Sequence, residues 1–256
     1  MPVAANLYYF LHEDGGAERP PLILIHGVGG NYQLWPPEIR RMAGQRVLAL
    51  DLPGHGKSEG PGLQSVTDYA RHLVAFMKAV GLYKAVIGGH DLGGAIALEM
   101  AIEHPKWVAG IALLASGARL PVASARLEAA ANPSMYAALV RQLQQSAFGP
   151  QAPEQARALL GRVMAGTRPT VFYGDLLACN HLDLSSRLSN VRVPTLILCG
   201  SQDRTTPLSF SEDLASGIRG AALQILDGAG HMLMLEQPRR VAGLLRLFLQ
   251  TIPWPD

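Results

Sequence analysis

Short apolar runs recur along the chain, and most of them are continuous instead of alternating with polar residues. A strand that is buried on both faces has this pattern, which favours a parallel sheet covered by helices. Several of the runs end in a turn that is rich in glycine or contains aspartate. The predicted strands are residues 22–25, 47–50, 85–87, 108–115, 195–198 and 223–226.

Longer segments with helical spacing lie between these runs. In residues 68–77, for example, Tyr69, Leu73 and Phe76 fall on one stripe of a helix. Residues 92–104 and 238–250 are also predicted to be helical. Alternation of strands and helices is typical of βαβ units, so the pattern predicts an α/β protein with a doubly wound, mostly parallel sheet.

One region departs from the alternation. Residues 117–188 contain no buried-strand run and are helical in pattern, with breaks at Asn132-Pro133, Gly149-Pro150 and Arg168-Pro169. The next strand follows only after this region. We therefore expect residues 117–188 to form an inserted helical lid over the carboxyl edge of the sheet, and residues 1–116 and 189–256 to form the core.

Composition narrows the class of protein. The 256 residues are 48% hydrophobic and 16% charged, which suits a large buried core and excludes disorder. A net charge of +2 gives no electrostatic footprint for nucleic acid. No apolar run is long enough to span a bilayer, and the N-terminus does not resemble a secretory signal. We expect a cytoplasmic enzyme with two reduced thiols, Cys179 and Cys199, and with no partner among nucleic acids or membranes.

The most informative segment is Gly89-His90-Asp91-Leu92-Gly93, where a strand leads into a tight turn and a helix follows at once. Such a turn strains the backbone of its central residue and requires small neighbours two positions before and after it. Its effect is to expose one side chain above the sheet, at the positive end of a helix. Serine is the usual residue at this apex, and here it is Asp91.

Three further segments follow other strands. After His26-Gly27, the backbone N–H of Val28 is placed to form an oxyanion hole together with the N–H of Leu92. Asp203 follows the fifth predicted strand, and His231 follows the sixth. Because the carboxyl ends of parallel strands gather at one edge of a sheet, Asp91, Asp203 and His231 should converge there.

These motifs resemble those of the α/β-hydrolase superfamily, and the resemblance covers nearly the whole chain. It rests on His26-Gly27, the segment Asp51-Leu52-Pro53-Gly54-His55-Gly56-Lys57-Ser58, the turn at Asp91, Gly200-Ser201-Gln202-Asp203 and Gly228-Ala229-Gly230-His231. The resemblance implies that Asp91 is the nucleophile, Asp203 the acid that orients the histidine, and His231 the base. It also makes Asp51 and His55 parts of a structural turn. No metal is expected, because no third ligand is spaced for it. No cofactor is expected, because both reaction steps need only water and the triad.

The apex and its surroundings point to different branches of that superfamily. The surroundings are similar to those of serine-type esterases, lactonases and C–C hydrolases, whereas an aspartate apex resembles epoxide hydrolases and haloalkane dehalogenases. Three hypotheses therefore stay open: a carboxylesterase or lactonase framework in which Asp91 stands in place of serine, a true Asp-nucleophile hydrolase, and a ligand-binding protein without turnover. The framework as a whole favours the first.

The Asp-nucleophile hypothesis requires help for the leaving group. Dehalogenases hold the halide with side-chain donors, and Val28 and Leu92 offer none. Epoxide hydrolases use two lid tyrosines as acids, and Tyr136 and Tyr173 are the candidates here, although both can equally be packing residues. An epoxide is therefore favoured over a haloalkane. Under every hypothesis we expect a small, mostly apolar and uncharged substrate, and the oligomeric state is left open.

The two carboxylates beside His231 also predict a pH dependence. Both anions favour the imidazolium form, which cannot activate water, so activity should rise into the alkaline range.

Overall fold

The computed structural model describes residues 2–14 and 19–254, so the outermost residues of the predicted core domain lie outside the described ranges. Its strands are β1 (Val3–Ala4), β2 (Leu7–Asp14), β3 (Leu22–Ile25), β4 (Gln45–Leu50), β5 (Ala85–His90), β6 (Val108–Leu114), β7 (Thr195–Gly200) and β8 (Ala222–Leu226). Its α-helices are α1 (Pro37–Arg40), α2 (Val66–Ala79), α3 (Leu92–Glu103), α4 (Ser124–Ala131), α5 (Pro133–Ser146), α6 (Glu154–Ala165), α7 (Pro169–Asn180), α8 (Leu208–Gly217), α9 (Leu233–Glu236) and α10 (Pro238–Thr251). Short 3₁₀ turns are η1 (Tyr32–Leu34), η2 (Pro105–Trp107) and η3 (Ser185–Asn190).

The strands form one sheet in the order β1-β2-β4-β3-β5-β6-β7-β8. All neighbours from β4 to β8 are parallel, as the continuous apolar runs predicted. The sequence pattern missed β1 and β2, which pair antiparallel at the edge. The reason is burial, because half of the residues of β2 are only half-buried and the strand ends in exposed Glu13 and Asp14, so it lacks a continuous apolar run.

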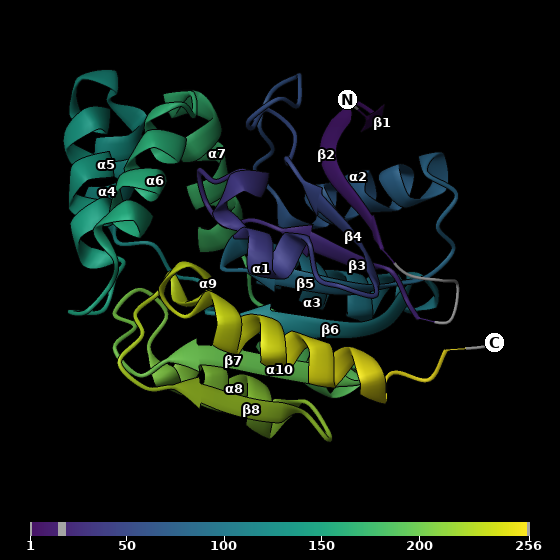
Figure 1. Cartoon of the computed structure of the whole chain (residues 1–256). Helices are drawn as coiled ribbons and strands as arrows, with labels where there is room; N and C mark the ends of the chain where they lie inside the picture. The colour runs from purple at the N-terminus through teal and green to yellow at the C-terminus, as the bar shows by residue number, and fades with distance from the viewer. Residues whose placement is uncertain (1, 15–18, 255–256) are drawn as a thin grey trace.

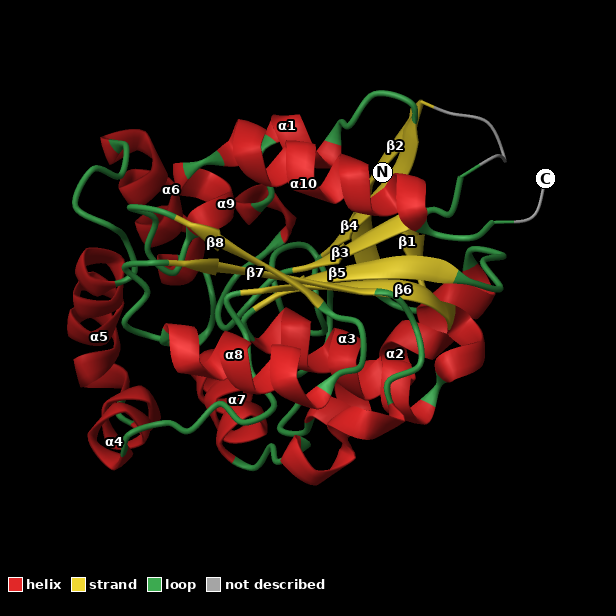
Figure 2. Ribbon diagram, turned by 90° about the horizontal axis from the view of Figure 1, so that it is seen from below, coloured by secondary structure: helices red, strands yellow, loops and turns green. Residues whose placement is uncertain are grey.

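Helices cover both faces of the sheet (Figure 2), with α1 and α10 on one face and α2, α3 and α8 on the other. Alternate residues of the central strand β3 divide accordingly. Leu22 and Leu24 pack in the core cluster that includes Val241 of α10, whereas Ile23 packs in the cluster on the opposite face. The predicted doubly wound architecture is therefore confirmed.

Only helices lie between β6 and β7 within the described residues (Figure 1). Helices α4, α5 and α6 stand together beyond the ends of β7 and β8, at the carboxyl edge of the sheet. Helix α7 differs, since it packs against both α4 and the core helix α3. The division into a lid of residues 117–188 and a core of 1–116 and 189–256 stays a prediction. In the described part of the chain, no helix has the length and apolarity required to cross a bilayer.

Candidate active site

Asp91 stands at the sharp turn between β5 and α3. Its backbone has φ 52° and ψ −116°, a strained conformation for a residue with a side chain, at a cost of about 1–3 kcal/mol. The turn closes because its neighbours are glycines. A Cβ atom on Gly89 would lie 2.0 Å from the carbonyl oxygen of Gly93, and one on Gly93 would lie 2.2 Å from that of Ile25. The hydroxyl of Ser116 supports the strained unit by donating to the Asp91 carbonyl oxygen at 2.8 Å.

The Asp91 carboxylate lies against the predicted oxyanion hole. The N–H of Val28 donates to Asp91 Oδ2 at 3.1 Å, and the N–H of Leu92 also stabilises this carboxylate. Burial raises the pKa of Asp91, while the charge of His231 and the two N–H groups offset part of that rise. The two donors that sequence reasoning assigned to an oxyanion hole therefore face the side chain of the apex residue itself.

Asp203 and His231 meet at the same edge of the sheet. His231 Nδ1 donates to Asp203 Oδ2 at 2.9 Å, and both side chains are buried. The hydroxyl of Thr206 donates to the same Oδ2 at 2.7 Å, and the N–H groups of Thr205 and Thr206 donate to Oδ1. Burial raises the pKa of Asp203, but the His231 charge and these hydrogen bonds outweigh it and hold the pKa at about 2. Asp203 is therefore an ionised acceptor that fixes the orientation of the His231 ring.

His231 is surrounded by groups that control its charge. Burial lowers the pKa of His231, but Asp203 and, more weakly, Asp91 outweigh it, so the pKa is raised. The ring of His90 lies 4.7 Å from the His231 ring, centroid to centroid, and its Nε2 donates to the His231 carbonyl oxygen at 3.0 Å. Burial and the His231 charge lower the pKa of His90 to about 3, so His90 is a neutral support.

One cavity joins these groups. Asp91, His231 and the Val28 loop line it, and most of the remaining wall is apolar. The apolar lining comes from the core and from the inserted helices, and includes Leu34, Leu143, Leu160, Met164, Phe172 and Met232. The positively charged side chain of Arg126 of α4 also lines the cavity, and its charge acts to lower the pKa of His231. The cavity fits a small, largely apolar molecule next to Asp91.

Tyr136 of α5 and Tyr173 of α7 do not reach this cavity. The hydroxyl of Tyr136 donates to the carbonyl oxygens of Met164 and Thr167, at 2.7 Å and 3.0 Å, and burial raises its pKa. Tyr173 is half-buried and packs against the core. Neither residue lines the cavity, so the acids that epoxide opening requires are not supplied by these side chains.

Sequence reasoning missed the supporting residues Ser116, Thr206, His90 and Arg126. The proximity of Thr206 to Asp203 along the chain was a usable signal, since a hydroxyl or amide close after a carboxylate in a loop commonly bonds to it. The other three residues act across the fold and leave no local pattern.

The segment around Asp51 is structural in the fold. Asp51 Oδ1 accepts from the N–H of Tyr32 at 2.7 Å, and Oδ2 accepts from the N–H of Lys57 at 2.8 Å. The carboxylate thereby joins two loops. Among the residues that the structure describes, no group of three or more His, Cys, Asp or Glu side chains is arranged to hold a metal ion.

Comparison with known proteins decides the family. The sequence profile of the alpha/beta hydrolase fold matches residues 20–238, which is most of the chain. The chain belongs to the α/β-hydrolase family. The family, the fold and the esterase, lactonase and C–C hydrolase branch that the motifs predicted are all confirmed.

Relatives within this family are hydrolases. A 2-hydroxymuconate semialdehyde hydrolase from Pseudomonas putida is 33% identical over 96% of this chain and 92% of its own length. A pimeloyl-[acyl-carrier protein] methyl ester esterase from Neisseria meningitidis is 30% identical, covering 90% and 93% of the two chains. The structure of the enol-lactonase from Burkholderia xenovorans LB400 matches with a TM-score of 0.88 at 23% identity, over 95% of this chain and 96% of that one. The prediction of a small-molecule hydrolase is confirmed at this level.

Proposed function

We propose that this α/β-hydrolase acts by covalent catalysis at Asp91, which attacks a saturated carbon of a small, mostly apolar substrate. The observation that carries the proposal is the bond from the Val28 N–H to Asp91 Oδ2. The Val28 N–H holds Oδ2, and the proposal assigns the attack to Oδ1. When the second oxygen is alkylated, the carbonyl oxygen of the resulting ester already lies where hydrolysis requires it.

The same bond argues against ordinary ester hydrolysis by this chain. Serine-type chemistry needs the oxyanion hole for the substrate carbonyl oxygen, but here the hole binds the apex carboxylate. Attack of Asp91 on an ester carbonyl would also give a mixed anhydride, which is less stable than the ester that formed it. Both points favour a saturated carbon as the electrophile.

The proposed reaction has two steps. First, a carboxylate oxygen of Asp91 forms a bond to the substrate carbon, and the leaving group departs with the bonding electron pair. Second, His231 takes a proton from water, and the hydroxide adds to the carbonyl carbon of the Asp91 ester. The tetrahedral oxyanion collapses, releases the alcohol after protonation by His231, and restores Asp91. Asp203 orients His231 throughout and stabilises its imidazolium form.

The cavity wall restricts the leaving group. Because Tyr136 and Tyr173 do not line it, a leaving group that must be protonated by these tyrosines is disfavoured. A group that leaves as a stable anion, such as a carboxylate or halide, requires no acid, and Arg126 places a positive charge at the wall. The proposed substrates are therefore small lactones or alkyl compounds that carry such a leaving group.

The experiment is turnover in ¹⁸O-labelled water. β-Butyrolactone, 1-bromobutane and styrene oxide are the probes, because they present three different leaving groups on a saturated carbon. For any probe that is turned over, the peptide that contains Asp91 should gain ¹⁸O, since the hydrolytic oxygen enters the Asp91 carboxyl. Product formation with an unlabelled Asp91 would contradict the mechanism.

The esterase and lactonase relatives favour a second candidate, in which the framework is serine-type and Asp91 replaces the serine. In that case Asp91→Ser should hydrolyse p-nitrophenyl butyrate rapidly, whereas the chain as it stands is nearly inert toward every probe. If Asp91→Ser has no activity on any ester or lactone, this candidate is wrong. Stabilisation by ligands without turnover in either form would indicate a binding protein.

A further inference from the structure

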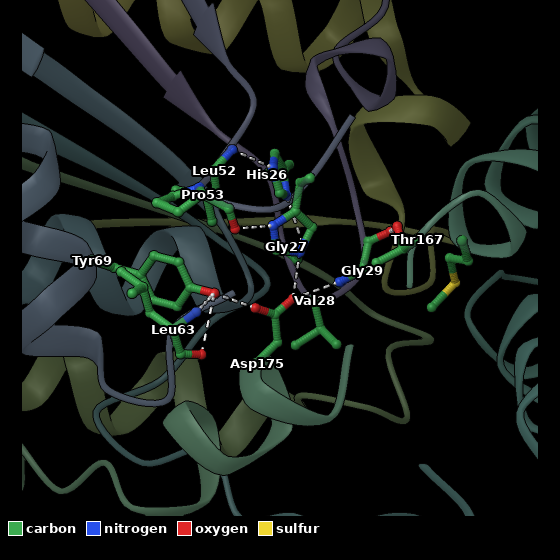
Figure 3. A network of polar contacts seen from close by, with 12 residues as sticks. His26, Gly27, Val28, Gly29, Leu52, Pro53, Leu63, Tyr69, Thr167 and Asp175 are labelled. Carbon is green, nitrogen blue, oxygen red and sulfur yellow. Dashed lines mark hydrogen bonds and ion pairs between the residues drawn. The ribbon is translucent and has the colours of Figure 1, made fainter. Parts of the chain in front are cut away.

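A second buried carboxylate lies on the other side of the oxyanion loop. Asp175 of helix α7 is fully buried and bonded on both oxygens (Figure 3). Oδ2 accepts from the N–H of Gly29 at 2.9 Å and from Nε2 of His55 at 2.8 Å, and Oδ1 accepts from the hydroxyl of Tyr69 at 2.5 Å. Gly29 follows Val28, whose N–H faces Asp91. The carboxylate is therefore one residue away from an oxyanion-hole donor.

The hydrogen bonds of the His55 ring show that His55 and Asp175 form a charged pair. Nε2 faces the Asp175 carboxylate, and Nδ1 faces the carbonyl oxygen of Pro53 at 3.1 Å. Both partners are acceptors, so both ring nitrogens must carry a proton. Burial lowers the pKa of His55, but Asp175 outweighs it and the pKa is raised. Burial and Asp175 also raise the pKa of Tyr69, which stays a donor.

His26 holds the other end of the peptide group that carries the Val28 N–H, which is the Gly27 carbonyl oxygen. The N–H of Leu52 donates to His26 Nε2 at 3.0 Å, so the neutral ring carries its proton on Nδ1, which donates to the carbonyl oxygen of Gly27 at 2.8 Å. That carbonyl and the N–H of Val28 belong to one peptide group. His26 is kept neutral, since burial and the charge of His55 lower its pKa to about 3.

The inserted region holds the next two peptide groups. Asp175 binds the N–H of Gly29, and the hydroxyl of Thr167 donates to the Gly29 carbonyl oxygen at 2.9 Å. Gly29 has φ +63°, and a Cβ atom there would lie 2.5 Å from the Phe172 ring of α7. Three consecutive peptide groups of the loop are thus fixed, one by the core and two by residues between β6 and β7.

We propose that Asp175 is a positioning residue for the oxyanion hole, which the inserted helix α7 and the core build together. By binding the Gly29 N–H, the carboxylate fixes the direction in which the preceding N–H of Val28 points. His55 supplies the opposite charge beside this buried carboxylate. Helix α7 is accordingly a fixed part of the site, and it cannot swing away as a lid without releasing the loop.

The test is the Asp175→Asn variant, read through the titration of Asp91. In protein labelled with ¹³C at the aspartate carboxyls, the Asp91 signal is assigned by its absence in Asp91→Asn. If the loop loosens, the Val28 N–H stabilises the Asp91 carboxylate less, and the pKa of Asp91 should rise. The loss of the negative charge of Asp175 would by itself lower the pKa of Asp91, because one anion near the Asp91 carboxylate disappears. The two effects have opposite signs, so a rise identifies positioning.

Two further readouts accompany it. Hydrogen exchange of the Gly29 amide should accelerate about tenfold, since a bond to a charged group is replaced by a weaker neutral one. For any substrate that the wild type turns over, kcat should fall about tenfold while KM changes less than threefold, because the hole acts mainly after substrate has bound. The kinetic readout rests on the proposed function, whereas titration and exchange do not, so the two proposals fail separately.

Tyr69→Phe is the matched control. It removes a donor to the same carboxylate but leaves the Gly29 bond, so Tm should fall while the Asp91 titration and Gly29 exchange stay in place. A folded Asp175→Asn chain whose Asp91 pKa is unchanged or lowered, with unchanged Gly29 exchange, would overturn the inference. If Asp175→Asn does not fold, Asp175→Glu replaces it, because it keeps the charge beside His55 but displaces the carboxylate from the Gly29 N–H. The absence of any rise in the Asp91 pKa in that variant would overturn the inference equally.

Discussion

Two buried aspartate–histidine pairs in this protein have nearly the same geometry. The pair Asp203–His231 is joined at 2.9 Å and the pair Asp175–His55 at 2.8 Å. In both pairs the carboxylate outweighs burial and raises the pKa of the histidine. The pair alone therefore does not distinguish a reacting histidine from a structural one.

The difference lies in the second nitrogen of each ring. In His55 it is bonded to the carbonyl oxygen of Pro53, and the side chain is entirely buried. In His231 the ring lines the cavity, and no hydrogen bond to Nε2 is recorded within residues 2–14 and 19–254. One histidine is locked as an imidazolium, and the other can exchange a proton with the cavity. Access of the second ring nitrogen to the cavity therefore distinguishes a histidine that can act as a base from one that is structural.

Replacement of His231 should give the largest effect on turnover. His231→Gln removes the base, so steady-state turnover should fall by about 10²–10⁴-fold. Alkylation of Asp91 does not require this base, so intact-protein mass spectrometry should show the covalent adduct accumulating. Turnover within tenfold of the wild type would contradict the assignment of His231 as the base.

Replacement of His55 should give the largest effect on stability. His55→Leu leaves the Asp175 carboxylate buried and unpaired, which should lower the free energy of unfolding by about 3–5 kcal/mol. The measurement is equilibrium unfolding in urea, with His231→Gln as the comparison. Glutamine can still donate to Asp203, which also keeps its bonds from Thr205 and Thr206, so this replacement should cost much less. Equal losses in the two variants would contradict a purely structural role for His55.

The stability that His55 contributes should also depend on pH. Its folded-state pKa is raised above the unfolded value of 6.5, so its contribution is fully present below pH 6.5. It is lost as the pH rises through the folded-state pKa. The difference in unfolding free energy between the wild type and His55→Leu should therefore shrink toward alkaline pH, and a difference that grows there would contradict the charged pair.

The sequence predicted the parts of this comparison that are local. Asp203 and His231 each follow an apolar strand at the carboxyl edge, so two strand ends and the rule for parallel sheets were enough to bring them together. Asp175 had no such signal. It lies in the middle of an insertion, and its partners His55 and Gly29 are 120 and 146 residues away in the chain. The sequence predicted a structural turn at His55, but the charge of Asp175 that faces it comes from tertiary packing.

The edge strand and the lid show the same limit. The runs that became β3 to β7 were visible because both of their faces are buried, whereas half-exposed β2 was not. Strand β8 is mostly exposed and was found only from its short run of apolar residues. The inserted helices were predicted as a class, but the contact of α7 with the oxyanion loop depends on how Phe172 packs against Gly29. Burial of a strand or helix leaves a pattern in the local sequence, whereas contacts between distant segments leave none.

The proton on His231 should make turnover depend on pH. The neutral form of His231 is the base, and its fraction increases as the pH rises. Because the pKa of His231 is raised, this increase extends to higher pH, and kcat should rise into the alkaline range. Below the pKa the slope should approach about tenfold per pH unit. Measurement of kcat across pH 6 to 9 tests this, since a flat profile over about that range, which spans the usual titration of histidine, would contradict it.

Arg126 should modulate that profile more weakly. Its charge opposes the imidazolium form of His231 and lowers the pKa, against the larger effect of Asp203. In Arg126→Met the acidic limb of the profile should therefore move to higher pH, with a loss of about threefold in kcat at neutral pH. The alkaline plateau should stay unchanged where hydrolysis of the Asp91 ester limits turnover, and it should fall where departure of the leaving group does. Arg141→Met is the control, because Arg141 is exposed on α5 and does not line the cavity. If the acidic limb moves to lower pH, or moves equally in both variants, the charge of Arg126 does not lower the pKa of His231. That result would contradict an electrostatic interaction between these two side chains across the cavity.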